Sequence, residues 1–505
     1  MKNQKVLLID FGGRYNQLTA RRIREMGVYC EITSLKSGLE AVSRSLPRAI
    51  ILAGGEGSAE DDSKVLDFCR SLIKTGIPLL GICYGARIIA KCLGGTVPED
   101  GEDKFAACTL KEGSGIAAGS SGEYMLSTLS IVKDTGAKLK AIAATKSRQI
   151  CAFKAVDLDI YGLAFQPVRE DGADAIYRFL FDVCGFTGEW TVKNFTAAAV
   201  EGLAQKLKGK KVLCALSGGV DSAVAATMVH KACGENLICI FVDHGLLRKF
   251  EAEEVMRVFK EQRNMNVIKI DAADRFLSRL EGVDEPERKR KIIGEEFIRV
   301  FEEAAKQIGK VDYLVQGTIY PDILESGFLH NPVIKSHHNV GGLPSVVDFK
   351  EIIEPLKELF KDEVRQVGLE LGLPEGIVMR QPFPGPGLGV RVVGAITRDK
   401  LQKLRDADFI FREEIAKAGL DRKIWQYFAV IIPVRSVGVT NSARTYGYTI
   451  ALRAVHSSDG MSAAWAHIPF EVLNKLSLRI CSEVEGISRV VYDITAKPPA
   501  TIEWE

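Results

Sequence analysis

Short apolar runs recur along the chain, each ending near Asp or Gly and each leading towards a stretch of helical character. They form an early and a later group, and in both the intervals are long enough for crossover helices. This alternation predicts two successive parallel α/β domains. The predicted strands are 6–9, 50–52 and 79–82 in the first group, and 212–216, 237–242, 267–270 and 313–315 in the second.

Two breaks in the pattern suggest domain boundaries. Residues 184–190 are rich in glycine and have no periodicity, which is typical of a domain seam. The prolines of 381–387 exclude a regular helix, and a smaller α+β domain is expected after them. The length of 505 residues also favours about three domains. The predicted fold is therefore two doubly wound parallel-sheet domains, 1–188 and 189–380, followed by a small α+β domain, 381–505.

The composition narrows the class of partner. Lys and Arg total 67 against 65 for Asp and Glu, so the net charge of +2 gives no field strong enough to indicate nucleic-acid or membrane partners, and neither is expected. The eleven cysteines include no CxxC pair, which favours buried thiols in a reducing compartment over a zinc or redox motif. No stretch reaches the roughly 18 apolar residues of a membrane span. Residues 1–10 look like a strand and not a signal peptide, so a soluble, cytoplasmic protein is expected.

Ser217-Gly218-Gly219-Val220-Asp221-Ser222 is the strongest candidate for chemistry. It joins a predicted buried strand, 212–216, to a predicted helix that includes 223–229. Such a junction directs free N–H groups and the positive end of a helix dipole at one small volume, which suits an anion. The glycines permit close approach of a polyphosphate, the serines can donate hydrogen bonds, and Asp221 can help to hold Mg²⁺.

This loop differs from the Walker loop, because it contains no GxxxxGK[ST]. It matches instead the loop of enzymes that cleave ATP between the α and β phosphates. The alternative is a glycine-rich helix cap with no ligand. Asp243 and His244 follow the next predicted strand, where ligands of doubly wound sheets collect. The basic run 288–291 could either contribute to this site or form a solvated helix face.

Several longer stretches resemble the GMP synthase family. They are 292–297, 316–322, 335–344, 382–387 and 497–505, and the likeness extends from residue 5 to the end of the sequence. The resemblance implies that ATP adenylates the 2-oxygen of xanthosine monophosphate (XMP), releasing pyrophosphate, and that ammonia then displaces AMP to give GMP. It also implies a homodimer formed through 381–505.

The resemblance assigns roles to particular residues. Ser217, Gly218, Gly219, Val220, Asp221 and Ser222 would bind ATP with Mg²⁺, with Asp221 as the metal ligand. Asp221 would also be catalytic, as would Lys335, His337 and His338, which would belong to a lid that excludes water. The residues implied for the purine nucleotide are Arg290, Asp322, Gln426, Arg489, Lys497, Ile502 and Glu503.

Residues 79–85 resemble the nucleophile elbow of a class I glutamine amidotransferase, with Cys83 as the nucleophile. That family supplies a histidine to form the thiolate and a glutamate to orient the histidine. Gln166 and Val168 occupy those two positions here, and neither can accept a proton from sulfur. Of the seven histidines the first is His230, so no histidine precedes it that could substitute.

Other departures point the same way: Glu56 stands where the family has proline, Ala86-Arg87 replace Met-Gln, and 125–130 lacks a Ser-His-Gly-Asp motif. We therefore expect no glutamine hydrolysis and a supply of free ammonia. Cys83 would then be a retained thiol in a relic domain. Alternatively, its pocket is repurposed, either to sense a different ligand or to let Cys83 carry another nucleophile such as sulfur.

The synthase half departs from the family pattern at Gln381 and at 440–443. Three hypotheses follow. The favoured one is an ammonia-dependent GMP synthase. The second is a related ligase that acts on another purine nucleotide or with another nucleophile, and the third is a non-catalytic nucleotide-binding regulator. A pyrophosphate-cleaving loop has little use in a regulator, which disfavours the third.

Overall fold

The structure is a computed structural model, and it divides the chain into two compact units, Met1–Phe195 and Thr196–Glu505. The residues that the structure describes are 4–13, 15–54, 62–98, 104–110, 113–119, 122–167, 173–328, 349–440, 443–457 and 460–505.

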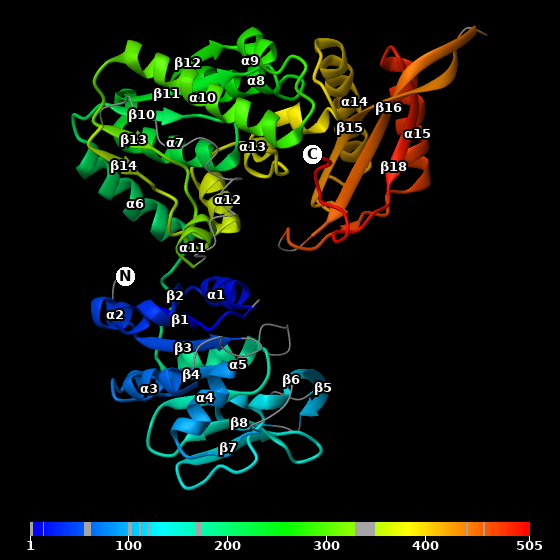
Figure 1. The fold of residues 1–505 in the computed structure, drawn as a ribbon. Coiled ribbons are helices and arrows are strands. Elements are labelled where there is room, and N and C mark those ends of the chain that lie inside the picture. The colour runs from blue at the N-terminus through cyan, green and yellow to red at the C-terminus, as the bar shows by residue number, and fades with distance from the viewer. Residues whose placement is uncertain are drawn as a thin grey trace. The chain divides into compact units, whose positions relative to one another are not determined.

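A seven-stranded sheet forms the centre of the first unit (Figure 1). In spatial order its strands are β2 (Tyr29–Ser34), β1 (Lys5–Asp10), β3 (Ala49–Gly54), β4 (Leu79–Cys83), β9 (Ile160–Leu163), β8 (Ile150–Ala155) and β7 (Leu139–Ala144). The first five are parallel, and the last two add antiparallel pairings. The helices are α1 (Asn16–Glu25), α2 (Leu35–Ser45), α3 (Asp62–Ile73), α4 (Tyr84–Cys92) and α5 (Ala173–Arg178); a separate hairpin pairs β5 (Phe105–Leu110) with β6 (Gly122–Ser127).

The second unit begins with a five-stranded sheet that is parallel throughout. Its spatial order is β12 (Asn266–Asp271), β11 (Leu237–Asp243), β10 (Val212–Ala215), β13 (Tyr313–Val315) and β14 (Glu351–Ile353). The helices of this part are α6 (Val192–Leu207), α7 (Val220–Cys233), α8 (Glu251–Val255), α9 (Ala273–Arg279), α10 (Pro286–Ile308), α11 (Tyr320–Phe328), α12 (Lys361–Glu370) and α13 (Glu375–Val378).

All seven strands predicted from sequence are present, and all belong to parallel pairings. The central ones are covered on both faces, so their sequences are continuously apolar and not alternating. Every residue of β3 and β4, for example, is buried. The predicted fold class is confirmed.

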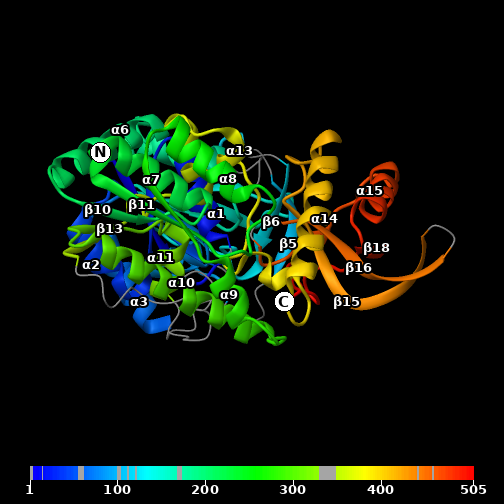
Figure 2. The same ribbon diagram turned by 90° about the horizontal axis from the view of Figure 1, so that it is seen from above.

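The remaining part of the second unit is a four-stranded sheet with two helices, seen from above in Figure 2. The strands β15 (Gln426–Thr440) and β16 (Ala443–His456) form a long antiparallel hairpin, to which β17 (Ala464–Trp465) and β18 (Ile487–Asp493) add. Helices α14 (Arg398–Lys417) and α15 (Phe470–Glu483) pack on this sheet. One continuous apolar core runs from Leu213 in the parallel sheet to Ile450 in the hairpin, so the two parts are firmly joined.

Two smaller expectations concern irregular segments. Residues 184–190, the predicted seam, form no helix or strand, and the two compact units divide a few residues later, between Phe195 and Thr196. Residues 381–386 likewise form none, and a short 3₁₀ turn, Gly387–Arg391, follows them. Among the helices that the structure describes, none is both long and apolar enough to cross a membrane.

Candidate active site

The loop from Ser217 to Ser222 joins the end of β10 to the first turn of α7. Its two serine hydroxyls bond each other, with 2.9 Å between their oxygens, and the Ser217 N–H donates to Ser222 Oγ at 3.2 Å. The Ser222 hydroxyl also donates to the Gly219 carbonyl at 3.1 Å. These hydrogen bonds join the two ends of the loop, and its last residues form the first turn of α7. A preformed helix N-terminus of this kind favours an anion without further rearrangement.

Two glycines, one in the loop and one packed against it, fit conformations or spaces that suit no larger residue well. Gly218 has φ +79°, a left-handed conformation that other residues adopt only with strain. Gly317 lies after the neighbouring strand β13, and a Cβ there would sit 3.1 Å from the Asp221 carbonyl carbon and from the Ser222 nitrogen. A side chain at position 317 would therefore crowd the start of α7, on which residues 316–318 pack.

Asp221, in the first turn of α7, has one carboxylate oxygen that is left without a hydrogen-bond partner in the described structure. Its Oδ2 pairs with Lys361 Nζ at 2.5 Å, while Oδ1 is buried and has no hydrogen-bond partner among the described residues. A buried carboxylate oxygen without a donor is costly unless a cation or ligand occupies it. Within the described part of the chain no three His, Cys, Asp or Glu side chains cluster as a metal cage. Mg²⁺ held by one carboxylate and by substrate phosphates fits this arrangement.

Arg380 connects the loop to α8. Its Nη1 donates to the Gly218 carbonyl at 2.7 Å, and its Nη2 pairs with Glu251, which is itself buried. Glu251 Oε2 in turn accepts from the Arg248 N–H at 2.9 Å. Sequence reasoning did not single out Arg380 or Lys361, because each meets the loop from a position about 140 to 160 residues away.

The end of β11 lies beside the loop, since β10 and β11 are adjacent parallel strands. Asp243 pairs with Lys269 at 3.0 Å. His244 is buried, and its Nδ1 accepts from the Leu246 N–H at 3.1 Å. Burial lowers the pKa of His244 to about 4, so this imidazole is neutral near pH 7. It acts here as a hydrogen-bond acceptor and not as a cation for phosphate.

The nucleotide residues implied by the family resemblance fall into two sets. Gln426 and Glu503 touch, with Gln426 Nε2 3.1 Å from Glu503 Oε1, and Ile502 packs beside Phe428 and Val430. Within the described residues, none of the others forms a hydrogen bond or an ion pair with Glu503. Those others are Arg290, paired with Glu287; Asp322, accepting from the Ile319 N–H at 2.9 Å; Arg489, bonded to Ser436 Oγ at 3.1 Å; and Lys497, bonded to the Gly460 carbonyl at 2.8 Å.

The four residues of the basic run 288–291 differ in how exposed they are to solvent. It lies in the first turns of α10, where Arg288 and Lys291 are exposed, Arg290 is half-buried and Lys289 is fully buried. The solvated-face alternative therefore holds for only part of the run.

The lid residues Lys335, His337 and His338 lie outside the described residues, as do Asn441 and Ser442 of the 440–443 departure. Gln381, the other departure, accepts from the Tyr427 N–H through Oε1 at 2.7 Å.

In the first unit Cys83 has the geometry of a nucleophile elbow. It ends β4 with φ +50°, and its side chain is buried at the start of α4. Gly85 makes this turn possible, because a Cβ there would lie 2.1 Å from the Leu52 carbonyl oxygen. Gln166 is buried three residues beyond β9, the strand next to β4. Val168 and Glu56 lie outside the described residues, whereas Arg87 lies on α4.

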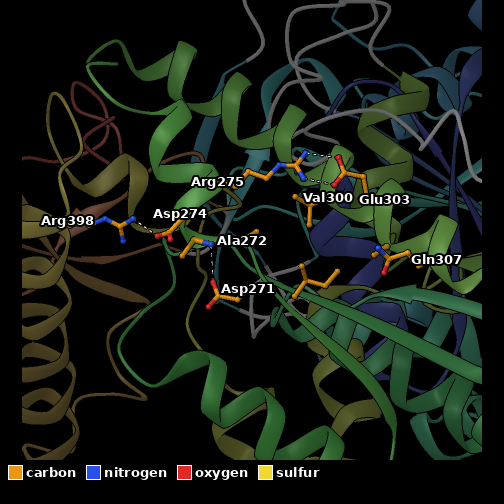
Figure 3. A pocket seen from close by; sticks show the side chains of 11 residues that line it. Asp271, Ala272, Asp274, Arg275, Val300, Glu303, Gln307 and Arg398 are labelled. Carbon is orange, nitrogen blue, oxygen red and sulfur yellow. Dashed lines mark hydrogen bonds and ion pairs between the residues drawn. The ribbon is translucent and has the colours of Figure 1, made fainter.

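A separate hollow of about 740 Å³ lies at the edge of the parallel sheet, beyond β12 (Figure 3). Four of its charged groups pair with one another: Arg275 makes two hydrogen bonds to Glu303, at 2.5 and 2.9 Å, and Arg398 pairs with Asp274. Asp271 accepts a hydrogen bond from the Ala273 N–H at 3.2 Å. None of the predicted site residues lines it. We therefore do not assign the chemistry of the 217–222 loop to this hollow.

Family models match three parts of the chain: glutamine amidotransferase class-I at residues 7–167, NAD synthase at 193–318, and GMP synthase C terminal domain at 413–504. Fold, loop and matches together define an ATP-pyrophosphatase-type ligase joined to a class I glutamine amidotransferase domain. The chain is 53% identical over 513 residues to the GMP synthase (glutamine-hydrolyzing) of Acetivibrio thermocellus, and 51% identical over 516 residues to that of Clostridium tetani. Both comparisons cover 100% of this chain and of the relative. The chain belongs to the GMP synthase family.

Proposed function

We propose that this protein adenylates XMP with ATP and aminates the adenylate to GMP, using free ammonia as the nitrogen source. The observation that carries the ATP step is the closed 217–222 loop, in which Asp221 presents one buried, unbonded carboxylate oxygen. The relatives are named for the same overall synthesis, and they match the chain over its whole length.

The first step places the α-phosphorus of ATP near the 2-oxygen of XMP. That oxygen attacks phosphorus and pyrophosphate leaves, which converts a poor leaving group into AMP. The loop N–H groups and the hydroxyls of Ser217 and Ser222 would hold the departing pyrophosphate. Lys361, at the N-terminal end of α12, adds a positive charge beside Asp221. Mg²⁺ on Asp221 would neutralise phosphate charge when bound.

The nucleotide would be held by Arg290, Asp322, Gln426, Arg489, Lys497, Ile502 and Glu503. Arg and Lys are suited to a phosphate dianion, and the amide and carboxylate of Gln426 and Glu503 to the polar edge of a purine. Lys335, His337 and His338 would close over the adenylate and exclude water, which would otherwise compete with ammonia at the activated carbon.

The proposed nitrogen source, free ammonia, differs from the one given in the names of the relatives, which are called glutamine-hydrolyzing. Glutamine hydrolysis needs a thiolate, and a base must remove the thiol proton. Gln166 and Val168 stand at the base and orienter positions of the family, and the sequence contains no histidine before His230. We therefore propose that the elbow at Cys83 is retained without glutaminase activity.

We also propose a homodimer through residues 381–505. Val437 and Tyr446 are direct cross-strand partners near the far end of the β15–β16 hairpin, and Val439 lies on the same face. Their exposed fractions are 50%, 63% and 74%. A cluster of large exposed apolar side chains favours an interface, because such surface is costly in water.

The double variant Val437→Glu, Val439→Glu tests this interface. We expect sedimentation of the unaltered protein to give the mass of two chains and that of the variant to give one, since buried like charges oppose association. Leu369→Glu is a matched control, because Leu369 is also an exposed apolar residue but lies on α12. A variant that still sediments as two chains would refute this placement of the interface.

The synthesis itself is tested by supplying purified protein with Mg²⁺, ATP, XMP and ammonium. The expected products are AMP, pyrophosphate and GMP in equal amounts. AMP formed without GMP would point to a different nucleophile. Turnover only after another purine nucleotide replaces XMP would point to a different substrate, and both results would overturn the proposal.

A further inference from the structure

Three fully buried cations contact residues 493–505, the segment that carries several of the proposed nucleotide-binding groups. Lys289, Arg391 and Arg453 are each 0% exposed, and they come from α10, from the 3₁₀ turn before α14, and from β16. A buried charge is tolerated only with a hydrogen-bonded partner of opposite polarity. All three find such partners in 493–505.

Lys289 contacts this segment at its far end. Its Nζ pairs with the Glu505 carboxylate and donates to the Val392 carbonyl at 2.8 Å. The other Glu505 oxygen accepts from the Gly394 N–H at 2.8 Å. The Glu505 side chain is therefore held from two sides, and it is 6% exposed.

Arg391 and Arg453 contact the same segment nearer its middle. Arg391 makes two hydrogen bonds to Glu503, at 2.9 and 3.0 Å, and its guanidinium lies 4.0 Å from the centre of the Phe428 ring. Arg453 donates to the Thr501 carbonyl at 3.1 Å and to the Thr495 carbonyl at 2.5 Å. The segment has no helix and only one isolated bridge beyond β18, so these contacts replace regular backbone pairing.

We infer that Lys289 is a positioning residue for the nucleotide substrate, acting through its buried pair with Glu505. The pair fixes the segment on which Lys497, Ile502 and Glu503 lie. It also ties that segment to α10, where Arg290 directly follows Lys289. The inference rests on the proposed nucleotide site, because it concerns the residues assigned there.

The test compares Lys289→Met and Glu505→Gln with their double variant, using Lys289→Arg as the conservative change. Lys291→Met is the matched control, since Lys291 lies on the same helix but is exposed. We expect KM for XMP to rise about 10- to 100-fold in Lys289→Met and in Glu505→Gln, because small misplacements of binding groups have effects of that size. KM for ATP should stay near its original value, and the double variant should be no worse than either single variant.

A second measurement needs no substrate. Hydrogen exchange of the peptide amides in 500–505 should be faster in Lys289→Met than in the unaltered protein or in Lys291→Met. If the unaltered protein does not use XMP, the proposed function fails, while the exchange experiment still decides whether the pair fixes the segment. Hydrogen exchange in 500–505 that is the same in Lys289→Met as in the unaltered protein would overturn the inference. So would a rise in both KM values, for ATP and for XMP, accompanied by a lower Tm, because that result indicates a general stabilising role.

Discussion

Asp221→Asn is expected to slow ATP cleavage by about 10²- to 10³-fold, the size of effect seen when one electrostatic group is removed from a transition-state site. Asparagine has nearly the same shape and can still accept the hydrogen bond from Lys361. It lacks the negative charge that would attract Mg²⁺ to the buried Oδ1 in the proposed site. The loop should therefore keep its structure while losing the metal ion.

The measurement is the rate of AMP formation with ammonium and XMP over a range of Mg²⁺ concentrations, with high Mg²⁺ recovering part of the lost rate. Glu235→Gln is the control, because Glu235 is an exposed carboxylate just beyond the opposite end of α7. If Asp221→Asn turns over at the unaltered rate at every Mg²⁺ concentration, Asp221 is not the metal ligand.

The second large effect concerns the nitrogen source. With ATP and XMP present, replacing ammonium by glutamine should lower GMP formation at least about 10³-fold, since removing the base from a nucleophile–base pair has effects of this order or larger. The Acetivibrio thermocellus relative, which is named as glutamine-hydrolyzing, serves as the positive control.

Two variants sharpen this experiment. Cys83→Ala should leave the ammonium-dependent rate unchanged, because the proposed reaction does not use the thiol. Gln166→His combined with Val168→Glu restores the side chains of the family pattern, and it should raise glutamate release if the elbow is otherwise intact. Glutamate release by the unaltered protein that disappears in Cys83→Ala would show that a base other than histidine operates, and the proposal would be wrong.

The fold was predictable to the extent that burial imposes a local pattern. Strands such as β1, β3 and β10 lie inside two-sided parallel sheets, so their apolar runs are unbroken and easy to recognise. The loop at 217–222 was recognisable for a related reason: a glycine-rich turn between a strand and a helix brings its candidate ligand groups together within six residues.

The sequence alone did not predict which residues of the basic run 288–291 are buried and which are exposed. Their composition is uniform, but Lys289 is buried and Lys291 exposed, because α10 presents one face to Val392 and Glu505 and another to solvent. Helical position and a partner 216 residues away decided the difference. Local patterns contain no information on such a partner.

By itself the sequence determined the two parallel α/β domains, the α+β domain after them, the glycine-rich loop between a strand and a helix, and the absence of any histidine before His230. These features depend on residue type and short spacing. Only the tertiary structure decided that Lys361 and Arg380 meet the loop and that three buried cations hold 493–505. Those contacts join residues far apart in the chain, and the physical reason for them is that a buried charge must find its partner wherever the fold places one.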